Sequence, residues 1–272
     1  MTESGGLVGG FHPVMEVLSL RPDSVVHLYL REDRQGEARM DGRRREIIRV
    51  ARSRGIPVDF LPGPAIDGLF ARFQSNSSPS KGAGPSGGPG KGGPSHQGVV
   101  ARIEEIATFP SLDDFLESFP GTPPSPLVAV DGVQDPRNLG ALLRTCDAAG
   151  VGGVLIPRRR VAPLSQTVAK TSAGALFTLP LVRIGNLSGT LRQLKKEGYA
   201  IAALDLSGDP LPEGPLPGPL VLVVGAEEKG VTRPVLDLSD WRFRLPMRGK
   251  VQSLNLSVAA GIFLYRQISG HS

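Results

Sequence analysis

The chain has 272 residues, 40% of them hydrophobic, and a net charge of +5, which suits one catalytic-sized domain with a small companion. This composition excludes wholesale disorder, and a single cysteine excludes a disulfide scaffold. No apolar run approaches the roughly 18 to 20 residues that span a bilayer, and the first residues lack the basic and apolar regions of a signal peptide. We therefore expect a soluble, cytoplasmic protein with no membrane partner.

The first hundred residues predict a small α/β domain that a coil interrupts. Residues 75–95 consist almost entirely of Gly, Ser and Pro, which cannot bury apolar surface, so this segment should be disordered. The helix predicted at 43–54 carries arginines on one face, which could touch RNA or simply solvate the helix. The other elements expected here are a helix at 12–20 and strands at 25–30, 58–61 and 96–103.

From residue 127 onward, strands and helices alternate, after a proline-rich boundary at 122–126. Near-continuous apolar strands between amphipathic helices indicate an α/β domain with a parallel sheet buried on both faces, where ligands bind beyond the carboxyl ends of the strands. The expected strands are 127–131, 153–157, 178–184, 199–204, 220–224 and 242–246, and the expected helices are 138–149, 164–173, 187–197, a short piece after residue 229, and 254–267. The predicted organisation is therefore a domain at 1–106, a linker at 107–126 and a second domain at 127–272.

Positive charge gathers in residues 127–183 and 242–272. If the fold brings the two stretches together, a polyanion-binding face results; otherwise these are solvated surface arginines. The residues concerned are Arg137, Arg144, Arg158, Arg159 and Arg160 in the first stretch and Arg242, Arg244, Arg248 and Lys250 in the second.

Three segments carry polar residues just after predicted strands, where a parallel sheet would place them near a bound ligand. Asn138 stands where it could cap the helix that contains Arg144. The strand at 220–224 runs into a GxExxG turn, whose glycines would let a ligand approach the backbone, although the motif taken alone fits an ordinary strand-to-helix turn better. Ser253 and Asn255 lead an almost wholly apolar helix, where they should bond either its first amides or a ligand.

Together these segments resemble the SpoU/TrmH family of RNA ribose 2′-O-methyltransferases, which belongs to the trefoil-knotted SPOUT class. The matching positions are Asn138 and Arg144, then the GxExxG turn, then the run 246–262, in family order and spacing. The segments LVGGFHPVMEVL and HQGVVAR also resemble the small RNA-binding domain of the bacterial 23S rRNA guanosine 2′-O-methyltransferase subgroup. The chain departs from the family at Glu228, where glycine is common, and at Arg266, where an acidic residue is common.

The resemblance implies a knotted methyltransferase that uses S-adenosylmethionine, needs no metal, forms a homodimer and acts on RNA, most specifically 23S rRNA. It implies Gly225, Gly230, Leu245, Met247 and Leu254 as cofactor-binding residues. It implies a second, catalytic set, in which Arg144 stabilises the developing alkoxide, Glu227 is the rival base, and the polar residues orient the ribose: Asn138, Arg144, Glu227, Ser253 and Asn255.

Other activities remain open at this point. Within the class, the target could be tRNA or an rRNA loop that binds an antibiotic. Outside it, the chain could be an inactive knotted RNA-binding protein, which the presence of all five chemical positions disfavours. A nicotinamide-binding Rossmann enzyme is disfavoured because no GxGxxG motif is present. The single cysteine, Cys146, and four scattered histidines have no zinc-ligand spacing, so no metal is expected.

Overall fold

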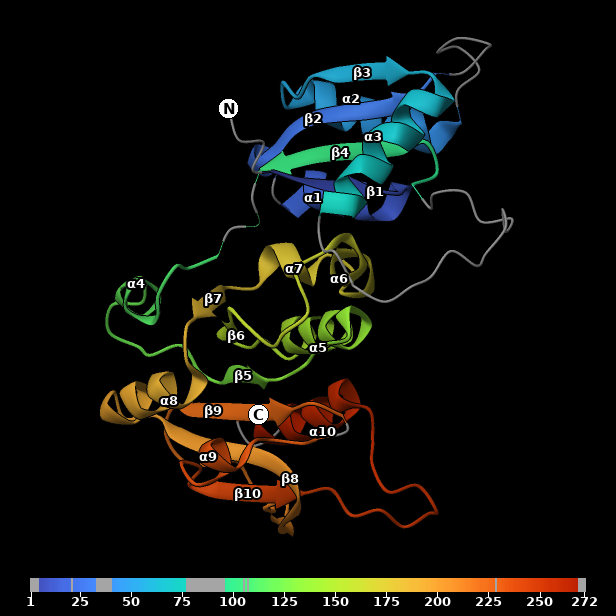
Figure 1. Ribbon diagram of the computed structural model, residues 1–272. Coiled ribbons are helices and arrows are strands. Elements are labelled where there is room, and N and C mark those ends of the chain that lie inside the picture. The colour runs from blue at the N-terminus through green and yellow to red at the C-terminus, as the bar shows by residue number, and fades with distance from the viewer. Residues whose placement is uncertain are drawn as a thin grey trace. The chain divides into compact units, whose positions relative to one another are not determined.

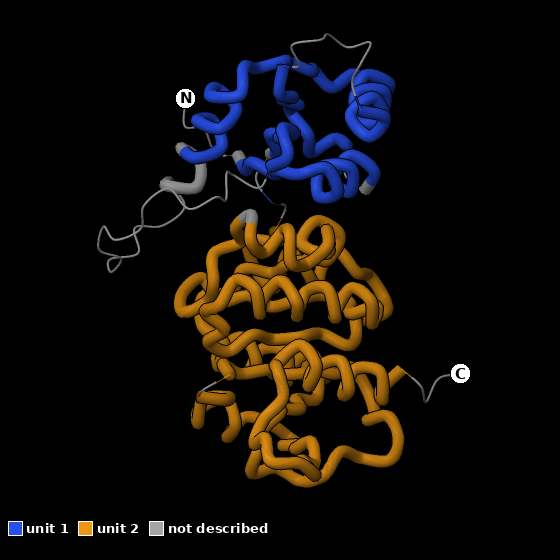
Figure 2. The backbone as a smooth tube through the Cα atoms, turned by 90° about the vertical axis from the view of Figure 1, so that its right-hand side faces the viewer, with its two compact units in different colours: residues 1–106 blue, residues 107–272 orange. Residues whose placement is uncertain are grey.

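The computed structural model describes residues 5–20, 22–32, 41–76, 96–104, 106, 108–227 and 229–268. The chain divides into two compact units, residues 1–106 and residues 107–272 (Figure 2). Most of the coil predicted at 75–95 lies outside the described residues, while residues 75 and 76 end a helix. Within the described part, no helix combines the length and the apolar character that a membrane crossing requires.

The first unit is a four-stranded mixed sheet in the order β1-β4-β2-β3, with β4 antiparallel to both neighbours and β2 parallel to β3. Three elements were not predicted: β1, which is rich in glycine and becomes a strand by pairing with β4; the short 3-10 helix η1 (Pro22–Ser24); and α3, which buries Ile66 and Phe70. The elements are β1 (Gly5–Gly9), α1 (Phe11–Leu20), β2 (Val25–Arg31), α2 (Gly42–Ser53), β3 (Val58–Leu61), α3 (Gly63–Asn76) and β4 (Val99–Glu104).

Helix α2 buries an apolar face and leaves arginines outside, as its spacing predicts. Part of the arginine face is structural, however. Arg44 donates to the carbonyl of Gln97 at 3.3 Å, and the Arg43 guanidinium lies 5.6 Å from the ring centre of Phe11. Arg45 and Arg49 are exposed. The strongly basic face of this helix therefore divides between packing and solvent.

The second unit contains six parallel strands in the order β10-β8-β9-β5-β6-β7 (Figure 1). Since all run the same way, their carboxyl ends share one edge. The strands are β5 (Leu127–Asp131), β6 (Gly153–Pro157), β7 (Leu181–Ile184), β8 (Ala200–Pro210), β9 (Leu220–Gly225) and β10 (Trp241–Arg244), and the helices are α4 (Leu112–Glu117), α5 (Pro136–Ala148), α6 (Gln166–Thr171), α7 (Ala175–Thr178), α8 (Leu187–Lys196), α9 (Arg233–Leu236) and α10 (Leu256–Ile268).

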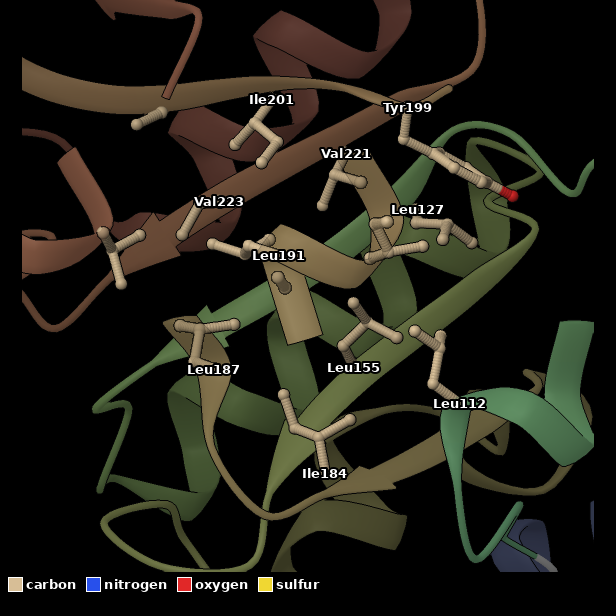
Figure 3. Close-up of a cluster of buried hydrophobic side chains, with 14 of the residues drawn as sticks. Leu112, Leu127, Leu155, Ile184, Leu187, Leu191, Tyr199, Ile201, Val221 and Val223 are labelled. Carbon is tan, nitrogen blue, oxygen red and sulfur yellow. The ribbon is translucent and has the colours of Figure 1, made fainter. Parts of the chain in front are cut away.

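Both faces of this sheet are buried, which explains the unbroken apolar strands. On one face, alternate residues such as Leu127, Val221 and Ile201 pack against α4, α8 and α9 (Figure 3). The intervening residues, such as Val128 and Leu222, are equally buried and turn to the opposite face. There α5 and α10 lie against each other, with Gly261 close to Thr145.

Several predicted boundaries differ from the structure, and the strand predicted at 199–204 continues to Pro210 as β8. The predicted linker at 107–126 contains α4, whose Leu112 and Phe115 are buried in the core of the second unit. The predicted strand at 178–184 begins only at Leu181, because residues 175–178 form a helical turn. Buried helical turns and buried strands are both rich in apolar residues, so hydrophobic periodicity over so few positions cannot distinguish a helix from a strand.

Tyr199 connects the core to the segment before β5, since its hydroxyl donates to the carbonyl of Pro124 at 3.0 Å. Its side chain is buried, and burial, with a smaller contribution from the charge of Glu197, raises the pKa of Tyr199 to about 12. The unfolded chain ionises this phenol near pH 10, so the unfolded state loses the proton first. The stabilisation is complete below pH 10 and disappears as the pH rises to about 12.

We therefore predict that the free energy of unfolding falls more steeply between pH 10 and 12 in the wild type than in Tyr199→Phe, by at most about 3 kcal/mol. At neutral pH the variant should lose about 1 kcal/mol, since the Pro124 carbonyl loses its donor. Urea unfolding at a series of pH values measures both quantities. Parallel stability curves for the two proteins at alkaline pH would contradict the prediction.

Candidate active site

A cleft of about 260 Å³ opens at the carboxyl ends of β8, β9 and β10, inside the second unit. This is the edge of a parallel sheet at which ligands bind. Its walls are largely apolar, and the charged and hydroxyl side chains among them are those of Asp205, Glu227, Lys229, Arg244 and Ser253. The lining residues used below are Leu204, Asp205, Leu206, Gly225, Glu227, Gly230, Phe243, Leu245, Met247, Ser253 and Leu254.

The GxExxG turn folds tightly upon itself at one wall of the cleft. The amide of Gly230 donates to the carbonyl of Ala226 at 2.7 Å, and a Cβ at Gly225 would lie 2.0 Å from the carbonyl carbon of Gly230. Gly230 itself has φ +62°, a conformation that glycine adopts freely. From the sequence, these glycines were expected either to let a ligand approach the backbone or to form an ordinary strand-to-helix turn. In the structure, Gly225 is needed first because the chain's own backbone crosses it.

A second wall comes from β8, which the sequence did not place at the site. The pairing between β8 and β10 jumps from Ala203 to Asp209 while β10 advances by one residue, so residues 204–208 bulge outward. Leu204, Asp205 and Leu206 from this bulge line the cleft. The strand order that puts β8 beside β9 is not readable from the sequence, which is why these residues were missed.

Asn255 joins three elements at the cleft. Its amide nitrogen donates to the Asn138 side-chain oxygen at 3.1 Å and to the Glu227 carboxylate at 2.9 Å, which uses both of its N–H groups. Its oxygen accepts from the Ser257 amide at 3.0 Å and from the Ser257 hydroxyl at 2.6 Å. One side chain thus caps α10 and fixes Asn138 of α5 against Glu227 of the β9 turn.

Asn138 does not cap α5, contrary to the prediction. The cap is Asp135, whose carboxylate accepts from the Arg137 amide at 2.7 Å, and the helix begins at Pro136. Proline fits the first helical position because it lacks the N–H that would otherwise need a partner. The cap three residues earlier leaves the side chain of Asn138 for the contact with Asn255.

The remaining predicted residues divide into two groups. Ser253 and all five predicted cofactor-binding residues line the cleft. Arg144 follows Asn138 by six positions on α5, roughly 9 Å along the helix axis, and is exposed. Among the described residues it makes no hydrogen bond or ion pair with the cluster of Asn138, Glu227 and Asn255, so the predicted orientation of Arg144 by these side chains is not observed.

The two predicted basic stretches share the carboxyl edge only in part. Arg158, Arg159 and Arg160 follow β6 at this edge, and Arg244 ends β10 there. Arg242 instead turns away, donating to the carbonyl of Leu236 at 2.9 Å and to Asp237 at 3.3 Å. Cys146 is fully buried, and burial raises the pKa of its thiol well above the ordinary range, so it is not a nucleophile.

Comparison with known sequences assigns both units. Residues 125–265 match the SpoU rRNA Methylase family, and residues 7–75 match an RNA 2′-O ribose methyltransferase substrate-binding domain. The chain belongs to the SpoU family. The motif positions identified in the sequence fall inside the matched region.

Relatives in the SpoU family cover nearly the whole chain. The 23S rRNA (guanosine-2′-O-)-methyltransferase RlmB of Nitrosomonas europaea is 34% identical over 97% of this chain and 91% of its own length. The enzyme of the same name from Neisseria meningitidis is 36% identical over 94% of this chain and 91% of its own. The SpoU methyltransferase AviRb of Streptomyces viridochromogenes, solved with AdoMet, shares the fold, with a TM-score of 0.72, 23% identity, and coverage of 98% and 91% of the two chains.

The double role of Asn255 gives a prediction. In Asn255→Asp the cap survives, because an aspartate oxygen accepts equally well and a negative charge suits a helix N-terminus. Both N–H groups that bond Asn138 and Glu227 disappear, and the new carboxylate faces the carboxylate of Glu227. We expect a thermal midpoint within a few degrees of wild type and methyl transfer slower by on the order of 10²-fold.

Asn186→Asp is the matched control, since Asn186 caps α8 and takes no part in the cluster. Fixed-time assays measure the rate of methyl transfer by each variant, and calorimetry measures its thermal midpoint. Turnover in Asn255→Asp equal to that of Asn186→Asp would show that the bridge is not needed.

Proposed function

We propose that the protein is an S-adenosylmethionine-dependent RNA ribose 2′-O-methyltransferase that modifies a guanosine of 23S rRNA. The observation that carries the proposal is the cluster of Asn138, Glu227 and Asn255 at the mouth of the apolar cleft. Membership of the SpoU family and the RlmB relatives support the reaction and the substrate. No observation favours a tRNA target over rRNA.

The cleft suits S-adenosylmethionine. Leu245, Met247 and Leu254 offer apolar surface for a flat adenine, and the carboxylates of Asp205 and Glu227 are acceptors for hydroxyl and ammonium groups. Gly225 and Gly230 bring backbone to the cleft without side chains in front of it. When bound, this cofactor supplies a methyl group already activated on a sulfonium centre.

The residues of the chain then have to place and deprotonate a ribose 2′-hydroxyl. Asn138 accepts from Asn255 through its oxygen, so its own amide N–H groups are directed elsewhere and can donate to the ribose. Glu227 has one oxygen engaged by Asn255 and a second available as an acceptor for the hydroxyl proton. By the family resemblance, Arg144, which is exposed and cationic on the same helix as Asn138, is the residue that stabilises the developing alkoxide. Ser253 adds a hydroxyl at the same rim.

The first unit would select the RNA, and the second would act as a homodimer with a trefoil knot, as the resemblance implies.

An exposed apolar surface on α10 supports the proposed dimer. On α10, Val258, Ile262 and Tyr265 recur at helical spacing and are 49%, 43% and 50% exposed. Phe263, the next residue after Ile262, is fully buried and belongs to the core. A contiguous apolar stripe of this kind is typical of a subunit interface.

The proposed function is tested by methylation of unmodified 23S rRNA with labelled S-adenosylmethionine, followed by mapping of ribose methylation. We expect one modified guanosine for the wild type. Arg144→Ala should lose about 10²-fold or more in turnover while its affinity for the cofactor stays within twofold, because the guanidinium is outside the cleft lining. Absence of methyl transfer to 23S rRNA by the wild type would refute the proposed substrate.

The dimer predicts a solution mass twice the 28.7 kDa of the chain. Ile262→Glu should shift the protein toward monomer at micromolar concentration, because it buries a charge in the interface, whereas Ile262→Ala should stay dimeric. Light scattering distinguishes the two masses. A wild-type mass of 28.7 kDa at micromolar concentration would reject the interface.

A further inference from the structure

The loop after β6 carries three consecutive arginines, Arg158, Arg159 and Arg160, and all are exposed. Because the sheet is parallel, this loop lies at the edge that holds the cleft. In the strand order, β10, β8 and β9 form the cleft, β5 leads to Asn138, and β6 comes next. Neighbouring strands are roughly 4.8 Å apart, so the arginine loop lies one strand beyond the Asn138 side of the site.

The loop is held firmly at both ends. The Arg158 amide donates to the carbonyl of Ile184 at 2.8 Å, and its guanidinium donates to the carbonyl of Pro110 at 2.9 Å. The Ala162 amide donates to the carbonyl of Val133 at 2.8 Å, in the segment that leads from β5 to Asn138. Arg159 and Arg160 therefore project from a short span between anchors, one of which also positions the candidate site.

The two projecting arginines have no structural task of their own. Among the residues that the structure describes, neither makes a hydrogen bond or an ion pair, in contrast with Arg158 and Arg242. Arg160 has φ +59°, which side chains rarely adopt and glycine adopts freely. The segment from 158 to 165 contains no acidic residue that could pair with either arginine.

We propose that Arg159 and Arg160 bind phosphates of the substrate RNA next to the target nucleotide, on the side of the site opposite the cofactor cleft. This inference rests on the proposed function, and it adds a docking surface to the second unit. The planar guanidinium group of an arginine can donate two parallel hydrogen bonds to the oxygens of one phosphate, which is a bidentate contact. Contacts of this kind carry no sequence information but fix the register of the RNA, so that the chosen ribose meets Asn138 and Glu227.

The test compares three double variants with the same loss of charge. R159A/R160A removes the proposed contacts. R192A/K196A removes two exposed charges from α8, which connects β7 to β8 and runs back toward the opposite edge of the sheet. R159A/R160G repeats the first change while relieving the left-handed backbone at residue 160. Thermal midpoints and S-adenosylmethionine affinities establish that all three are folded.

Binding to unmodified 23S rRNA is measured by filter retention between 50 and 400 mM KCl. Over this range of salt concentration, the affinity of a protein for RNA depends strongly on how many phosphates it contacts. For both loop variants we expect roughly tenfold weaker binding, a slope of log K against log salt that is smaller by about 1.5, and a KM for RNA that rises while kcat stays within about twofold. The α8 variant should match the wild type in all three.

A wild-type slope in the loop variants would overturn the inference, and so would an equal loss in the α8 variant, which would reveal a bulk charge effect. Failure of the proposed function looks different. In that case the wild type transfers no methyl group to the rRNA, whereas the binding slopes still decide whether Arg159 and Arg160 contact phosphate.

Discussion

A parallel sheet buried on both faces constrains everything else in the second unit. Every strand must be followed by a crossover that returns to the same starting edge, so all carboxyl ends gather at the other edge. The turn after β9, the start of α5 and the loop after β6 are separated in the sequence, and this constraint together with the strand order β9-β5-β6 makes them neighbours. The cleft, the polar cluster and the arginine loop all occupy that edge.

Asn255 turns this proximity into fixed geometry. An asparagine side chain has two donors and one acceptor oxygen, and here every one is used, by Asn138, Glu227 and Ser257. The cap that starts α10 therefore also aligns the candidate catalytic groups. Because the same helix packs on α5 and presents the exposed apolar stripe, the proposed dimer and the alignment of the site would depend on one element.

The site also shows how two backbone irregularities create space in a regular fold. The bulge at 204–208 moves β8 out of register with β10, and the closed turn after β9 brings Gly225, Glu227 and Gly230 to the wall of the cleft. Regular strands alone would leave a flat edge. Both features place backbone polar groups at a partly apolar cleft, which is the combination that small-molecule sites need.

The sequence by itself determined the order of most strands and helices, the apolar core positions and the three segments that carry the SpoU motifs, because burial on both faces and helical spacing leave strong local patterns. Only the tertiary structure decided that Asp135 rather than Asn138 caps α5, that β8 lines the cleft, and that Arg242 turns away from the edge while Arg159 and Arg160 stay on it. Several residues can cap a helix, and strand order is not local. Such choices depend on which partners the folded chain brings within hydrogen-bonding distance.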